Sequence, residues 1–166
     1  MPDTRTNRSL AHAFAKLSRA AARRKVYSRK AAKDGRPEVA HFLRAMSASE
    51  KAQARRLFNS LIGKVDTSKE YITTIFDKEV EKILETYSDL IDNATAERPG
   101  LLPALAQLRA AETRLRSFYS QDSNDINVNE NAGYYVCQFC GYLSVDQAPE
   151  KCPICGAPKD AFHEVN

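Results

Sequence analysis

The sequence predicts a mainly α-helical protein, in which a bundle of four helices precedes a small β-rich module that holds a metal ion. Three observations lead to this fold class. Stretches of the first 120 residues repeat apolar side chains every three or four positions, the spacing of amphipathic helices. Proline and glycine are concentrated at the short connections between these stretches. All four cysteines lie in the last 30 residues, and no helical pattern follows them.

Each predicted helix ends at a recognisable signal. We expect helices over 5–33, 37–62, about 66–96 and about 101–119. Gly35 and Pro37 separate the first two helices, because glycine favours a helix end and proline a helix start. Gly63 closes the second helix, and Pro99-Gly100 breaks the chain before the fourth. Four helices with short connections favour a bundle.

The polar stretch 121–133 separates the helices from the cysteine-rich end. It is rich in Asn, Asp and Ser and has little to bury, so it is expected to be a linker. The predicted organisation is therefore a helical bundle over 1–120, a linker over 121–133 and a tetracysteine domain over 134–166.

The cysteines form two matched pairs, Cys137-Gln-Phe-Cys140-Gly and Cys152-Pro-Ile-Cys155-Gly. Each Cys-x-x-Cys turn presents two thiolates to one ion, and two facing turns complete the tetrahedron that iron or zinc prefers. Two disulfides are the alternative. They are disfavoured because no secretory signal is expected and cytosolic thiols stay reduced.

Three glutamates interrupt the apolar stripes of the helices. Glu50, Glu79 and Glu112 each take a position in a stripe, and Gln53 joins Glu50 in the second helix. Buried charges are costly unless they are paired or bind a metal, so the three carboxylates are expected to converge in one polar site.

The chain resembles the rubrerythrin family, whose members combine a ferritin-like four-helix bundle with a rubredoxin-like domain. The resemblance rests on Tyr135-Val136-Cys137-x-x-Cys140-Gly141-Tyr142, an 11-residue spacer and Cys152-Pro153-x-Cys155-x-x-Pro158-Lys159-x-x-Phe162. In the helical region, Ala13-Phe14-Ala15 through Gly35 and the connection Gly63-Lys64 fit the family as well. The resemblance covers nearly the whole chain.

The resemblance also implies a bundle site for two irons, held by single glutamates and Glu-x-x-His pairs. This chain departs from that pattern. A first-helix glutamate is replaced by Leu17, the two pairs read Glu50-x-x-Gln53 and Glu112-x-x-Leu115, and Lys82 stands where a further glutamate is expected. We therefore predict no di-iron centre. Lys82 and Arg24 are the cations that would balance the remaining carboxylates, although a single ion held by Glu50, Glu79 and Glu112 is an alternative.

The resemblance implies a redox role for the cysteine site. Iron is favoured over zinc because apolar side chains, Tyr135, Tyr142, Pro149, Pro153 and Phe162, are placed to shield the sulfurs. Since the cysteines fill every ligand position, one-electron transfer at a rubredoxin-type centre is the predicted function. Peroxidase activity is predicted absent, and a homodimer and a redox partner protein are expected.

Charge is distributed unevenly along the chain. Residues 5–33 hold ten Lys or Arg and no acid, whereas 122–166 hold seven acids and two lysines. Electrostatic docking between the two, or two ordinary solvated surfaces, explains this pattern. The alternative function is a zinc-ribbon interaction protein or nucleic-acid-binding protein that uses the basic first helix. It is disfavoured because Arg24 is expected to face inward and no reading motif is present. We expect a cytoplasmic protein with no membrane span.

Overall fold

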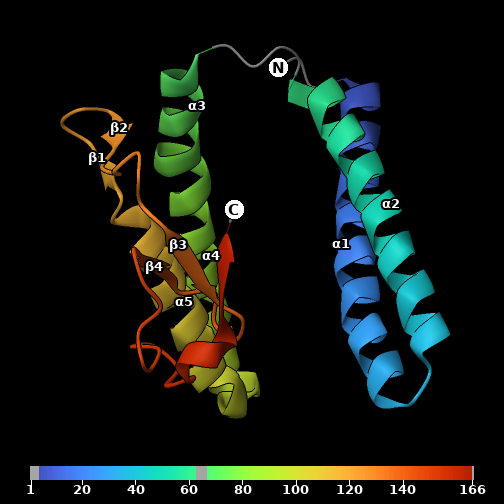
Figure 1. The fold of residues 1–166 in the computed structure, drawn as a ribbon. Helices are drawn as coiled ribbons and strands as arrows, with labels where there is room; N and C mark the ends of the chain where they lie inside the picture. Colours follow the sequence, from blue (N-terminus) through green and yellow to red (C-terminus); the bar gives the residue numbers. More distant parts are fainter. Residues whose placement is uncertain (1–3, 63–66, 166) are drawn as a thin grey trace. The chain divides into compact units, whose positions relative to one another are not determined.

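The computed structural model describes residues 4–62 and 67–165, including all their side chains except those of Ser68 and Lys69. The chain forms two compact units, Met1–Val65 and Asp66–Asn166. The division falls within the helical region. Most described residues are helical, and the strands all lie in the second unit (Figure 1). A mainly α fold with a β-rich carboxyl end is thereby confirmed.

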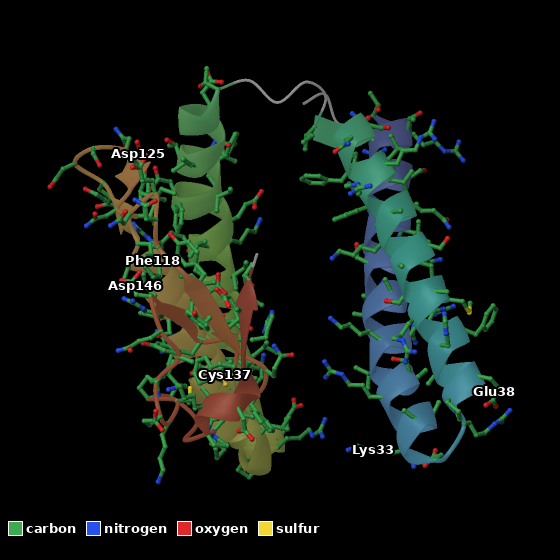
Figure 2. The ribbon with its side chains drawn as sticks, viewed as in Figure 1. Lys33, Glu38, Phe118, Asp125, Cys137 and Asp146 are labelled. Atoms are coloured by element: carbon green, nitrogen blue, oxygen red, sulfur yellow. The ribbon has the colours of Figure 1, made fainter. Side chains whose placement is uncertain are left out.

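The first unit is an antiparallel pair of long helices, α1 (Arg5–Lys33) and α2 (Pro37–Ile62), with the predicted bounds (Figure 1). The Thr4 side chain caps α1 by accepting a hydrogen bond from the backbone N–H of Asn7. Gly35 adopts φ 72° in the turn between the helices, a conformation that glycine enters without strain. Lys33 and Glu38 flank this turn in Figure 2.

Small side chains let the two helices approach closely. Ala21, Ala40 and Ala54 are buried, and Ser28 is the buried polar residue among them. The Ser47 hydroxyl donates a 2.8 Å hydrogen bond to the carbonyl of Ala21 across the pair. Alanine and serine therefore allow the close approach, and the rings of Phe14 and Phe58 pack across the pair with centroids 5.3 Å apart.

The second unit opens with one long helical stretch in three parts: α3 (Ser68–Thr74), the π-helical η1 (Ile75–Val80) and α4 (Glu81–Glu97). The backbone N–H of Thr67 donates to the Glu70 carboxylate in a capping box at its start. A short 3₁₀ turn, η2 (Pro99–Leu101), leads into α5 (Leu102–Arg116), which packs against α4.

The fourth helix is shorter than predicted, because α5 ends at Arg116 rather than near 119. Tyr119 leaves the helix to pair with Ile126 in a two-stranded ladder of β1 (Tyr119–Ser120) and β2 (Asp125–Ile126). The Tyr119 ring stacks on Phe76 with centroids 5.0 Å apart. This stacking and strand pairing outweigh the helical propensity, and they place the second strand of the ladder, β2, within the stretch expected to be a linker.

The carboxyl-terminal sheet has three antiparallel strands in the order β4-β3-β5. The central strand β3 (Tyr134–Cys137) pairs with β4 (Leu143–Val145) and with β5 (Phe162–Val165), which follows the 3₁₀ turn η3 (Lys159–Ala161). The register sets Cys137 opposite Phe162. In the part of the chain that the structure describes, no helix has the length and apolar character needed to cross a membrane.

Candidate metal centre

Two equivalent turns present the four cysteines. In the first turn the backbone N–H of Gly141 donates to the carbonyl of Cys137 at 2.9 Å, and in the second Gly156 donates to Cys152 at the same distance. Both glycines have positive φ, 80° and 74°, which other residues adopt only with strain. The first turn starts at the end of β3, where Figure 2 labels Cys137.

The four sulfur atoms lie close enough to share one ion. All the Sγ atoms are within 4.8 Å of one another. The Sγ atoms of Cys137 and Cys155 are 3.7 Å apart, and those of Cys140 and Cys152 are 3.5 Å apart. A tetrahedral ion with sulfur ligands at about 2.3 Å requires sulfur atoms about 3.8 Å apart. These residues therefore fit a tetrathiolate ion, and their separations exceed the roughly 2.05 Å of a disulfide.

The electrostatics of the site favour a bound cation. Burial raises the pKa of the Cys140 and Cys155 thiols. For Cys137 burial acts in the same direction, but backbone N–H donation from Cys140 and Phe139 brings the pKa of the thiol below its ordinary value. Without a cation the cluster cannot deprotonate fully at neutral pH, so metal binding displaces the thiol protons.

The centre is itself the core of the module. The buried residues Cys137, Cys140, Cys152 and Ala157 form one cluster. Tyr142, Ile154, Ala161 and Phe162 pack on it. Tyr142 and Phe162, which were predicted to shield the sulfurs, are in this packing, whereas Pro153 is exposed. Sequence reasoning missed Ile154 and Ala161, although Ile154 stands between two ligands.

The structure assigns the helical carboxylates to different environments. Glu50 forms an ion pair with Arg24, with Nε to Oε1 at 3.0 Å, as the charge-balance hypothesis anticipated. Glu79 lies exposed in η1, and Glu112 is half-buried on α5. Because Glu50 belongs to the first unit and the other two to the second, their convergence stays a prediction.

The two other polar residues expected at that site are exposed within their own units. Gln53 is exposed and donates a 3.3 Å hydrogen bond to the Ser49 hydroxyl rather than to a glutamate. Lys82 is exposed on α4. Among the side chains that the structure describes, the four cysteines are the one group of three or more potential ligands that lie close enough to share an ion.

Burial raises the pKa of Glu112, which makes the stability of the second unit depend on pH. A carboxyl that binds its proton more tightly in the folded state stabilises the fold most at low pH, and this contribution is lost as pH rises through the folded pKa. Glu112→Gln is therefore expected to raise the Tm at pH 7 and to change it little at pH 4. The exposed Glu85→Gln serves as the control in thermal unfolding. An equal gain at both pH values would contradict the assignment.

Comparison with known proteins agrees with this site. The profile of the "Rubrerythrin, rubredoxin-like domain" matches residues 135–163, which include all four cysteines. Rubrerythrin-2 of Clostridium acetobutylicum is 27% identical over 154 residues, which cover 82% of this chain and 84% of that protein. These matches make the chain similar to rubrerythrins and support that family. Reverse rubrerythrin-1 of the same organism shares 56% identity over 32 residues, or 19% of this chain.

The rubrerythrin fold is also found among solved structures. A structure of nigerythrin in a mixed-valence state aligns over 99% of this chain and 91% of its own, with a TM-score of 0.51 and 21% sequence identity. At that identity the likeness supports the fold. It agrees with the predicted fold class, a ferritin-like helical bundle followed by a small rubredoxin-like module.

Proposed function

We propose that this rubrerythrin-family chain is a one-electron carrier that uses an iron ion held by Cys137, Cys140, Cys152 and Cys155. The observation that carries the proposal is the set of four sulfur atoms within 4.8 Å of one another in a rubredoxin-like module. When bound, iron supplies a reversible exchange between the ferric and ferrous states. Four protein ligands leave no position for a substrate, so electron transfer is the chemistry that remains.

The surrounding residues tune such a centre by hydrogen bonding and burial. The backbone N–H groups of Phe139 and Cys140 donate toward the Cys137 sulfur, and that of Tyr142 donates toward Cys140. These bonds stabilise negative charge on sulfur and so favour the reduced, more negative form of the site. Three of the cysteines are at most 4% exposed, and their burial excludes water. Burial therefore opposes the extra negative charge of the reduced site. The balance of the two effects sets the reduction potential.

We also propose that the helical units have lost the di-iron peroxidase centre. Support comes from Leu17, Gln53 and Leu115 at positions where the family pattern calls for ligands, and from Lys82 in place of a further carboxylate. The Arg24–Glu50 pair adds to this support, because the guanidinium already neutralises one of the three remaining carboxylates. We also propose that the chain forms a homodimer, which sedimentation would detect. It would bind a separate redox partner protein, which cross-linking would capture.

Metal analysis combined with a peroxide assay tests both proposals. We expect one iron per chain, the red colour of a ferric tetrathiolate that bleaches on reduction, and no hydrogen peroxide turnover above that of free iron. A colourless protein with one zinc would contradict the carrier. About three irons per chain with rapid peroxide consumption would contradict the loss of the di-iron centre. A variant in which serine replaces all four cysteines is expected to show no peroxide activity. Activity that persists in it would show that the helices still bind metal.

A further inference from the structure

The first unit carries a large excess of positive charge. Residues 1–65 contain 16 Lys or Arg and 4 Asp or Glu, a net charge of +12, whereas residues 66–166 contain 9 and 17, a net charge of −8. A charge of +12 on a small helical pair produces a strong positive field. The redox proposal for the cysteine site leaves this field without a role.

The described carboxylates of this unit are already engaged. Asp34 pairs with Lys30, and Glu38 pairs with Arg36 at 3.3 Å. Glu50 pairs with Arg24 at 3.0 Å. Lys25, Arg29, Arg44 and Lys51 are not in these ion pairs, so their charge is available to an outside partner.

Four of these cations line one groove between α1 and α2. Small residues occupy the same groove, and the lining residues are Lys25, Ser28, Arg29, Ala32, Arg44, Ser47, Ala48 and Lys51. The groove encloses about 450 Å³ and has no acid among its lining residues. On each helix these residues recur at steps of three and four, so a strip of small side chains runs along the groove with cations from both helices.

A second hollow on α1 extends the basic surface. It is lined entirely by cations, Lys16, Arg19 and Arg23. All three are exposed, and together with the groove they distribute positive charge over more than one side of α1. The surface therefore offers an extended array of cations rather than a single pocket.

The groove lies away from the apolar stripe of α2. Met46 marks that stripe, and Arg44 and Lys51 lie about 160° and 140° around the helix from it, at about 100° per residue. The apolar stripe is the surface that a helical bundle covers. The cations that α2 contributes to the groove and its apolar stripe therefore lie on different sides of this helix.

We infer that this groove, which we call the basic groove, binds the phosphate backbone of duplex nucleic acid without sequence preference. Lys25 and Arg29 are one helical turn apart, about 6 Å along the axis, and duplex DNA offers one phosphate charge per about 1.7 Å of its axis. The hydroxyls of Ser28 and Ser47 already donate to helix carbonyls, and alanine has no polar group. The cations are therefore the groups that bind a ligand in the groove, and closely spaced phosphates match them. Acidic segments in the second unit of another copy are the weaker candidate ligand. The net charge of −8 on that unit neutralises only part of the +12 on the first unit.

Binding of the full-length, metal-loaded protein to a fluorescent 20-base-pair duplex of arbitrary sequence tests this inference. The triple variant Arg29→Gln, Arg44→Gln and Lys51→Gln removes three charges from the basic groove. The matched control, Arg98→Gln, Arg109→Gln and Lys151→Gln, removes three exposed charges from the second unit. Both have the same net charge, so they separate a local effect from a global one. Circular dichroism and iron content confirm that both variants fold.

The groove variant is expected to weaken duplex binding at least tenfold at 0.1 M salt, with the control within twofold of the parent. The slope of log affinity against log salt should fall in magnitude by about 2.7, or about 0.9 for each lost phosphate contact. No binding at 50 mM salt, or equal losses in the two variants, would overturn the inference. So would equal affinity for anionic phospholipid vesicles, or a groove variant that alters self-association but not duplex binding.

Discussion

Cys152→Ser is expected to abolish metal binding and to unfold the three-stranded sheet, while the helices of both units persist. The buried cluster of the module consists of three of the cysteines and Ala157, so it has almost no hydrophobic core without the ion. In small domains of this kind the free energy of metal binding, on the order of 10 kcal/mol, is largely the free energy of folding. Loss of one ligand therefore removes most of the stability of the module.

Limited proteolysis and metal analysis measure this outcome. In the variant, cleavage sites should appear within 134–165, and iron should fall well below one per chain, while the helical circular dichroism changes little. Phe139→Ala is the control, because Phe139 lies between two ligands yet is 75% exposed. Its metal content and its protease resistance should match those of the parent. Protection of the sheet in metal-free Cys152→Ser would show that the ion is not its core.

Arg24→Met is expected to lower the free energy of unfolding of the first unit by about 2 kcal/mol. It leaves the Glu50 carboxylate, whose side chain is 15% exposed, without its partner. The second oxygen of that carboxylate, Oε2, is already buried and makes no hydrogen bond. Removing one partner of a buried pair costs about 3–5 kcal/mol, and the 28% exposure of Arg24 reduces that figure through solvent screening.

Urea unfolding of a double-variant cycle isolates the effect. Arg24→Met with Glu50→Gln should recover most of the loss, because no unpaired charge remains. Arg36→Met removes the exposed partner of Glu38, where both side chains are 66% exposed, and should cost less than about 0.5 kcal/mol. If Arg24→Met and Arg36→Met had equal effects, the Arg24–Glu50 pair would be an ordinary surface contact. Arg24 would then not be the cation that replaces a metal in balancing the charge of Glu50.

The helix bounds followed from the sequence where local signals decide them. The first helix ends and the second begins as predicted because Gly35 and Pro37 act through their own backbone geometry. The end of the fourth helix was predicted too late, since Tyr119 is held by a ring from η1 and by a strand partner distant in sequence. Gln53 was predicted to be buried from its place in an apolar stripe. Within the first unit alone it is exposed, so its burial in a four-helix bundle stays a prediction.

The sequence alone determined the ligand set, because two Cys-x-x-Cys turns with trailing glycines specify their own local geometry whatever surrounds them. It also determined which carboxylates remain in the helices. Only the tertiary structure decided that four sulfurs separated by an 11-residue spacer meet within 4.8 Å, that Arg24 binds Glu50, and that cations from two helices share one groove. The physical reason is the same in each case: these contacts join residues far apart in the chain, and packing rather than local backbone preference brings them together.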